Sequence, residues 1–338
     1  MPNSFTTDVD ELAQELIDAF NLTFAETEQR LSDPLIRWLD YRLRYIDPCP
    51  RQTVKSTGFD SRVPPAAQPA LQQFVALSEA GGDLNPYQTK TIKRNDSSGT
   101  KAQLRTDGLW TDWHIHHVHL TEAPLAAGQE FSDRSEWLLF FMAGPDTLAL
   151  IDVRLHNQVD VFQDVSLVEQ AIRSWPLQFE RFAANGVTGL ARQPAIDAES
   201  IKKLRTSGVT QMLMVDGKVY HPPGFGVTSA ATSTTVSLRR NDAKRLARDI
   251  GTFFDDPRNE PMQHAANEGV TNPTFSLAVT DKGRLAIDCK ETAVRWRFPT
   301  PPDRDDARSQ LENLLLPVWA GSKLVAHLMS SHGTGGTT

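Results

Sequence analysis

Three short apolar segments constrain the fold most strongly. They cover Asp112–Leu120, Glu136–Ala143 and Thr147–Leu155, and each is rich in β-branched or aromatic residues, a composition typical of strands. The residues Gly144-Pro145-Asp146 stand between the last two segments and are typical of a turn. We therefore predict a small antiparallel sheet at the centre of the chain.

Helices are predicted on both sides of this sheet. Apolar residues recur at helical spacing from Val9 to Tyr45, and further helices are predicted over Gln68–Ala80 and Val165–Ser174. Later in the chain, Asp216-Gly217 and Asp281-Lys282-Gly283 stand between short apolar segments and predict two hairpins. Strands over Thr234–Arg239 and Ala293–Phe298 and helices over Asp242–Phe254 and Asp303–Leu315 complete the predicted elements.

These patterns predict an α+β fold in four parts. A helical N-terminal region covers residues 1–99, and an α+β core that carries the histidine strand covers 100–190. A C-terminal α+β region with hairpins covers 191–329, and a disordered tail of small residues covers 330–338.

Cysteine content and hydropathy favour the cytoplasm. The two cysteines, Cys49 and Cys289, are far apart and support neither a disulfide framework nor a thiolate zinc site. The N-terminus lacks the plan of a secretion signal, and no apolar stretch reaches membrane-spanning length. We expect a cytoplasmic protein without membrane contact.

Charge is distributed unevenly along the chain. The net charge of −7 argues against simple non-specific polyanion binding. Residues 30–62 and 88–105 are nevertheless net positive, and the second segment includes Lys93 and Arg94. These segments indicate either contact with nucleic acid or a partner, or ordinary solvated helix and loop faces.

Histidine is concentrated in one predicted strand. Four of the nine histidines fall at positions 114, 116, 117 and 119. Because side chains alternate along a strand, His117 and His119 are predicted on one face, and His114 and His116 on the other.

Two imidazoles on one face support three interpretations. They can act as general acid and general base around one substrate, because the pKa of imidazole lies near neutrality. They can also hold a metal, with His156, Asp112 or Asp152 as a further ligand. In the third interpretation single histidines are buried and hydrogen-bonded.

Neighbouring residues favour phosphodiester chemistry. If the three strands form a meander, Arg134, Arg154 and His156 lie near the rim where the histidine face ends. A guanidinium beside an acid and base pair stabilises the charge that develops on the phosphorane. Alternatively, Arg134 and Arg154 pair with Glu136 and Asp152. Trp113 is a candidate for stacking on bases, with core packing as its alternative.

Five segments of the sequence carry a resemblance to known proteins. They are Asp47-Pro48-Cys49-Pro50-Arg51, Asp107–Leu120, Leu138–Phe141, Asp152–Asn157 and Ser174-Trp175-Pro176. On these residues the chain resembles a group of mostly uncharacterised bacterial proteins, whose signature is an Asp-Trp, a following His-x-His-Leu strand and a later strand that ends in His. The region is also remotely similar in layout to the small sheet of barnase-like and RelE-like toxin ribonucleases, which implies metal-independent RNA cleavage.

We therefore predict a histidine-based, metal-independent endoribonuclease that acts as a bacterial toxin or phage-defence effector and uses no cofactor. The predicted catalytic residues are His117, His119, Arg134 and His156, and the predicted substrate-binding residues are Arg154, Trp113, Lys93 and Arg94. RNA and an antitoxin or regulatory protein are the expected partners. The alternatives are a metal-dependent hydrolase or nuclease that uses the same strand, and a non-enzymatic binding or assembly protein.

Overall fold

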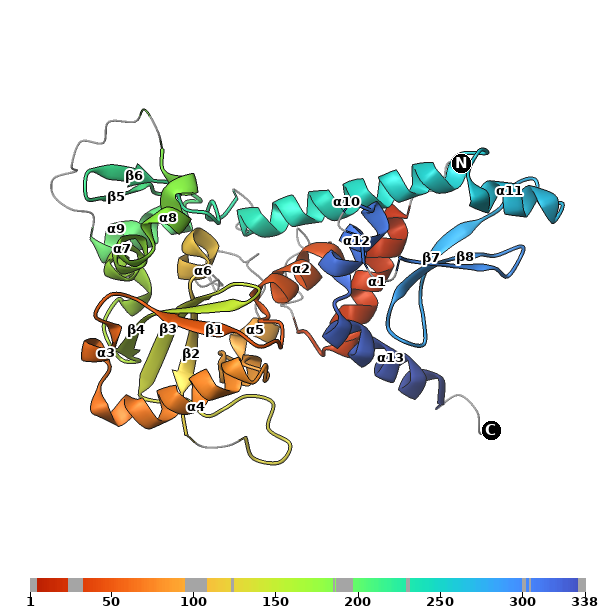
Figure 1. Cartoon of the computed structure of the whole chain (residues 1–338). Coiled ribbons are helices and arrows are strands. Elements are labelled where there is room, and N and C mark those ends of the chain that lie inside the picture. The colour runs from red at the N-terminus through yellow and green to blue at the C-terminus, as the bar shows by residue number, and fades with distance from the viewer. Residues whose placement is uncertain are drawn as a thin grey trace. The chain divides into compact units, whose positions relative to one another are not determined.

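The structure, a computed structural model, has an α+β fold with N-terminal helices and a central sheet, as the sequence predicts (Figure 1). It describes residues 5–23, 33–94, 108–122, 125–184, 186, 197–228, 232–299, 302–303 and 305–333. The chain divides into two compact units, one of residues 43–235 and one of residues 1–42 with 236–338. The predicted boundaries at 99 and 190 both fall inside the unit of residues 43–235. Residues 1–42 belong instead to the same unit as the C-terminal residues 236–338.

The unit of residues 43–235 is built on a four-stranded sheet with the order β1-β4-β3-β2. Its strands are β1 (Gln52–Lys55), β2 (His116–Leu120), β3 (Trp137–Ala143) and β4 (Thr147–Leu155). The β2–β3 and β3–β4 pairs are antiparallel, as predicted, whereas β1 pairs parallel to β4. The sheet is therefore mixed, with β1 as a parallel edge strand that the sequence analysis placed in the helical region.

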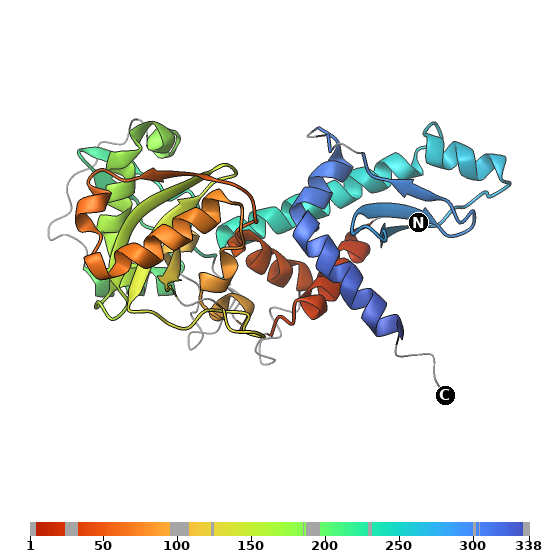
Figure 2. The same cartoon turned by 60° about the horizontal axis from the view of Figure 1, so that its bottom comes forward.

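Helices cover both faces of this sheet. Helix α4 (Gln68–Glu79) lies on one face and α7 (Val165–Ser174) on the other, as Figures 1 and 2 show. Two apolar cores result, because each face of the sheet carries its own set of buried side chains. The other helices of this unit within the described residues are α3 (Phe59–Arg62), α5 (Thr91–Arg94), α6 (Gly108–Trp113), α8 (Pro176–Phe179) and α9 (Ala198–Thr206).

A hairpin and a loop complete this unit. Strands β5 (Leu213–Val215) and β6 (Lys218–Tyr220) confirm the hairpin predicted around Asp216-Gly217. The loop 222–228 follows β6 and packs against α6, because the N–H of Gly224 donates to the carbonyl of Asp112 at 2.9 Å.

The second unit combines helices with a three-stranded antiparallel sheet. Its strands β7 (Phe275–Val279), β8 (Leu285–Cys289) and β9 (Arg295–Arg297) confirm the second hairpin and the third strand. An aromatic cluster of Phe20, Trp38 and Trp319 packs its helices together. The helices are α1 (Thr6–Ala19), α2 (Pro34–Arg44), α10 (Thr234–Asp255), α11 (Glu260–Asn267), α12 (Ala307–Leu315) and α13 (Val318–Gly333).

Three predicted elements differ in the structure. Residues 112–113 end helix α6 instead of beginning the histidine strand, and residues 234–239 are the first turns of α10 instead of a strand. Residues 330–333 of the predicted tail end helix α13, while 334–338 lie outside the described residues. Short apolar segments fit a strand or a buried helix equally well, and tertiary packing decides between them.

The helices that the structure describes include none with the length and apolar character needed to cross a membrane.

Candidate active site

Strand β2 presents two chemically different faces. Val118 and Leu120 point into the core under α4. His117 and His119 point to the opposite face, where the ring of His117 meets Phe140 and Phe162. This arrangement confirms the predicted alternation for the residues of the strand.

The rings of His119 and His156 stack on each other. His119 lies opposite Leu138 of β3, and His156 directly follows β4. The backbone N–H of His156 donates to the carbonyl of Glu136 at 2.7 Å and so extends the pairing of β4 with the β3 segment. The ring centroids of the two histidines lie 5.2 Å apart at an interplanar angle of 27°.

The environment of His119 holds its ring neutral at pH 7. Only 5% of the residue is exposed, and its Nδ1 has no hydrogen-bond partner among the described residues. Burial lowers the pKa of His119 from 6.5 to about 4, and electrostatic interactions with His117, His156 and Arg134 lower it further. A backbone hydrogen bond at Ser135 acts in the opposite direction. The four predicted catalytic residues thus lie close enough to interact electrostatically at one site.

His117 contacts two aromatic rings. Its ring centroid lies 4.9 Å from that of Phe162 and 6.0 Å from that of Phe140. Phe162 belongs to a short 3-10 helix, Val161–Gln163, between β4 and α7. Aromatic contacts of this kind fix the position of the His117 ring more firmly than that of a solvated side chain.

Arg154 shares the face of His119 but is paired with acids. Its guanidinium lies 2.9 Å from the carboxylate of Asp152 and 3.8 Å from that of Asp164. Asp152 is 2% exposed, and its carboxylate also lies 3.3 Å from the Nε of Arg62. The alternative that paired Arg154 with Asp152 is therefore confirmed, and a phosphate would have to compete with two carboxylates for this guanidinium.

The other predicted substrate-binding residues lie in different surroundings. Lys93 is buried, and its Nζ lies 2.7 Å from the carboxylate of Glu130. Trp113 is 5% exposed and belongs to the core beneath α7. The side chain of Arg94 and residues 95–105 of the basic segment lie outside the described residues.

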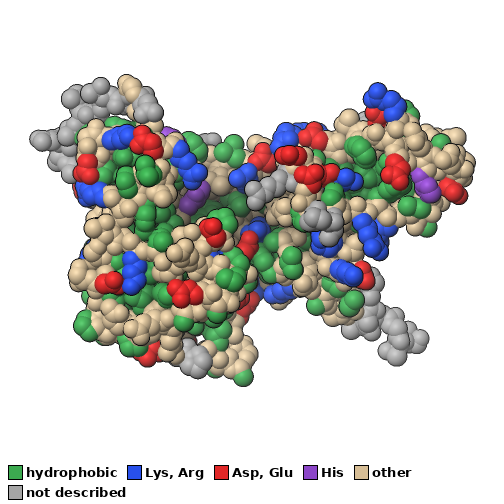
Figure 3. All heavy atoms as spheres, in the orientation of Figure 1, with side chains coloured by type: hydrophobic (Ala, Val, Ile, Leu, Met, Phe, Trp, Pro, Cys, Tyr) green, Lys and Arg blue, Asp and Glu red, His purple; other side chains and the backbone are tan. Residues whose placement is uncertain are grey.

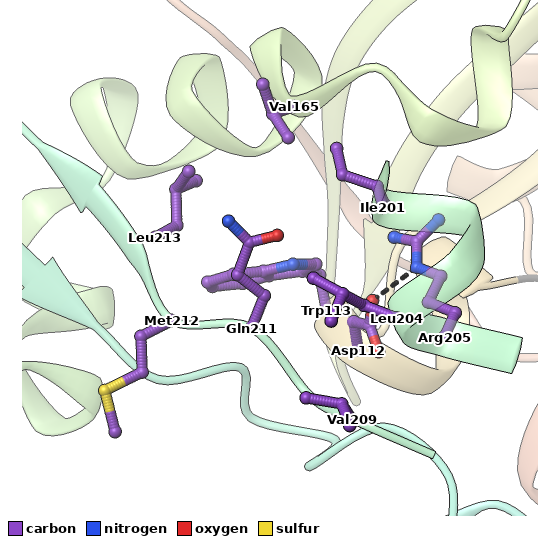
Figure 4. A pocket seen from close by; sticks show the side chains of 10 residues that line it. All are labelled: Asp112, Trp113, Val165, Ile201, Leu204, Arg205, Val209, Gln211, Met212 and Leu213. Carbon is purple, nitrogen blue, oxygen red and sulfur yellow. Dashed lines mark hydrogen bonds and ion pairs between the residues drawn. The ribbon is translucent and has the colours of Figure 1, made fainter. Parts of the chain in front are cut away.

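Trp113 also lines a small cavity next to a partly buried ion pair. Figure 4 shows the ring of Trp113 beside Gln211, with Asp112 and Arg205 at one side. The Nε of Arg205 donates to Asp112 at 2.7 Å, and its Nη1 donates to the carbonyl of Phe162 at 2.9 Å. A second cavity of ≈ 130 Å³ lies against the same ion pair. Asp112, a candidate metal ligand, is thus paired with an arginine.

The remaining two histidines of the cluster are not part of this face. His114 lies between α6 and β2 with a φ of 54°, and its Nε2 lies 3.3 Å from the Thr235 hydroxyl. The ring of His116 stacks on Phe141 at 5.7 Å between centroids. His116 is therefore a matched control for experiments on His119.

Sequence reasoning missed Arg205 and Phe162. Arg205 is 93 positions from its partner Asp112, so no local spacing connects the two. Phe162 lies in a 3-10 helix whose sequence carries no regular pattern.

Charged side chains are mixed in sign on the face shown in Figure 3, and the described residues include no cluster of metal ligands. Figure 3 shows Lys and Arg interspersed with Asp and Glu on the face in view, rather than one extended basic patch. No group of three His, Cys, Asp or Glu side chains with the arrangement of a metal site occurs in the part of the chain that the structure describes.

The sequence matches no model of a known protein family, and no curated protein or solved structure is significantly similar to it.

The low pKa of His119 predicts a loss of stability in acid. Below pH 6.5 the unfolded chain binds a proton at His119 that the folded chain does not bind until about pH 4. Folding stability at this site should therefore fall by up to about 3 kcal/mol as the pH drops from 6.5 to 4. Denaturant unfolding across this range should show a weaker pH dependence in His119→Leu than in the wild type, whereas His116→Leu should keep the wild-type dependence. Equal pH dependence of stability in all three proteins would contradict the lowered pKa of His119.

Proposed function

We propose that the chain is a metal-independent endoribonuclease in which His119 and His156 perform the acid and base steps. The observation that carries this proposal is the stacked pair of imidazoles at 5.2 Å, one of which, His119, is neutral at pH 7 and interacts electrostatically with Arg134. A neutral imidazole can accept a proton, and an imidazole in its protonated form can donate one.

The proposed reaction begins at the 2′-hydroxyl of RNA. His119 accepts the proton of this hydroxyl as its oxygen attacks the adjacent phosphorus. His156 donates a proton to the 5′-oxygen as the bond from phosphorus to that oxygen breaks. The products are a 2′,3′-cyclic phosphate end and a 5′-hydroxyl end, so atoms and charge balance without a metal.

Positive charge around the pair supports binding of an anion. Arg134 and His117 both lower the pKa of His119 electrostatically. A phosphodiester placed among them would offset this effect and raise the pKa of His119 toward the range in which a base is effective. Arg134 is assigned to stabilise the phosphorane charge, since its exposed guanidinium carries a permanent charge.

Two further parts of the proposal rest on the resemblance and on sequence patterns. A toxin or phage-defence role follows from the resemblance to toxin ribonucleases. An antitoxin or regulatory protein is the corresponding partner, and the cytoplasm, where RNA is abundant, is the corresponding location. The metal-dependent alternative is separated from this proposal by the same cleavage assay, because it requires loss of activity in chelator.

Cleavage of RNA in the presence of EDTA tests the proposal directly. Wild-type protein should produce 2′,3′-cyclic phosphate ends, and His119→Ala should cleave at least ~100-fold more slowly, because a general base contributes about 10²–10⁴ in rate. His116→Ala, on the opposite face of the same strand, should cleave within a few fold of wild type. Absence of cleavage by wild type, or undiminished cleavage by His119→Ala, would overturn the assignment.

A modified leaving group separates the roles of the two histidines. A substrate with sulfur in place of the bridging 5′-oxygen needs little help from a general acid, because a thiolate leaves readily. His156→Ala should therefore recover most of its lost rate on this substrate, whereas His119→Ala should remain slow. Recovery by His119→Ala alone would reverse the two roles, and recovery by neither would remove His156 from the acid step.

A further inference from the structure

The loop after β6 holds an aromatic side chain in a strained backbone conformation. Phe225 has a φ of 55°, a region that bulky residues avoid, yet 49% of the residue is exposed. Two hydroxyls fix this conformation, since Thr210 and Thr234 donate to the carbonyl of Phe225 at 2.7 and 3.1 Å. The chain thus retains a costly conformation that places an apolar ring at the surface.

The flanking glycines show that this loop packs closely against its neighbours. A Cβ on Gly224 would lie 2.1 Å from the carbonyl oxygen of Thr111, and one on Gly226 would lie 2.2 Å from the Thr210 hydroxyl. The N–H of Gly226 also donates to the carbonyl of Thr111 at 3.2 Å. Only glycine permits such close approach, so the loop packs tightly against α6, the helix that precedes the histidine strand.

The ring of Phe225 belongs to a layered aromatic surface. His221 stacks on it at 5.3 Å with an interplanar angle of 18°, and Phe182 meets His221 edge-on at 5.6 Å. The guanidinium of the exposed Arg181 lies over Phe182 at 4.7 Å. We call Phe182, His221 and Phe225 the aromatic shelf.

The polar groups of the shelf are only partly used within the protein. The Nδ1 of His221 has no hydrogen-bond partner among the described residues. Arg181 has no carboxylate partner within the same described part of the chain. The shelf therefore combines a half-exposed Phe225 with an adjacent arginine that has no carboxylate partner among the described residues.

We infer that the aromatic shelf binds an unpaired base of single-stranded RNA, with Arg181 near the adjacent phosphate. This inference rests on the proposed ribonuclease function and adds a substrate subsite to it. Stacking on an aromatic side chain beside a cation is a mode by which proteins hold single strands without reading their sequence. One face of Phe225 is covered by His221, so the exposed part of the ring is open to a further planar group.

Binding of a non-cleavable RNA tests the shelf separately from catalysis. The probe is a single-stranded 2′-O-methyl oligonucleotide that contains 2-aminopurine, whose fluorescence falls when the base stacks. Wild type should bind and quench it, whereas Phe225→Ala and Phe225→Leu should each bind about tenfold more weakly. Phe225→Tyr should bind like wild type, because it keeps a ring at the same backbone position.

A matched control removes apolar surface elsewhere. Leu177→Ala, in the same unit and 85% exposed, should bind like wild type. The shelf assignment would be wrong if Phe225→Leu binds and quenches the probe like wild type. It would also be wrong if Leu177→Ala weakens binding as much as Phe225→Leu does.

Cleavage of a dinucleotide distinguishes failure of the shelf from failure of the proposed function. A dinucleotide is too short to need a separate subsite, so Phe225→Leu should cleave it at the wild-type rate while losing efficiency on longer RNA. If the dinucleotide is cleaved but Phe225→Leu binds the oligonucleotide like wild type, the ribonuclease function is supported and the shelf is excluded as a binding site. If binding depends on Phe225 but no RNA is cleaved, the shelf is supported as a binding site and the ribonuclease function is excluded.

Discussion

The antiparallel pairing of β3 with its two neighbours is the constraint on which the rest of the site depends. It sets His119 opposite Leu138 and brings His156 opposite Glu136, with β3 between the two histidines. Because side chains alternate along strands, a shift of one residue in either pairing would turn a histidine into the apolar core under α4. The stacked imidazoles are therefore a consequence of strand register rather than of local sequence.

Burial of His119 lowers the stability of the fold and also keeps its imidazole neutral. A buried imidazole without a partner for Nδ1 destabilises the fold, since an unsatisfied buried polar group costs about 1–3 kcal/mol. The same burial, together with neighbouring positive charge, keeps His119 uncharged where a free histidine would be partly protonated. Polar groups held in this way occur often at functional sites, where stability is exchanged for a reactive group.

The three antiparallel strands of the sheet, and the face of β2 that carries His117 and His119, could be predicted from the sequence because both depend on local periodicity. Strand β4 and helix α7 have their predicted bounds, and the face of His117 and His119 follows from alternation. Strand β1 could not be predicted, since four residues paired with a strand some 95 positions away carry no pattern of their own. The pairing of Arg154 with Asp152 was foreseen as an alternative, whereas the pairing of Arg205 with Asp112 and the strain at Phe225 arise from tertiary contacts alone.

The most direct test of the central claim is the pKa of His119 measured by NMR titration of the imidazole signals, which are assigned by comparison with His119→Leu. The account predicts a value of about 4 in the free protein and a clear increase when a 2′-deoxy dinucleotide, which cannot be cleaved, places its phosphodiester at the site. A value near 6.5 in the free protein, or a low value that the dinucleotide leaves unchanged at saturation, would contradict it.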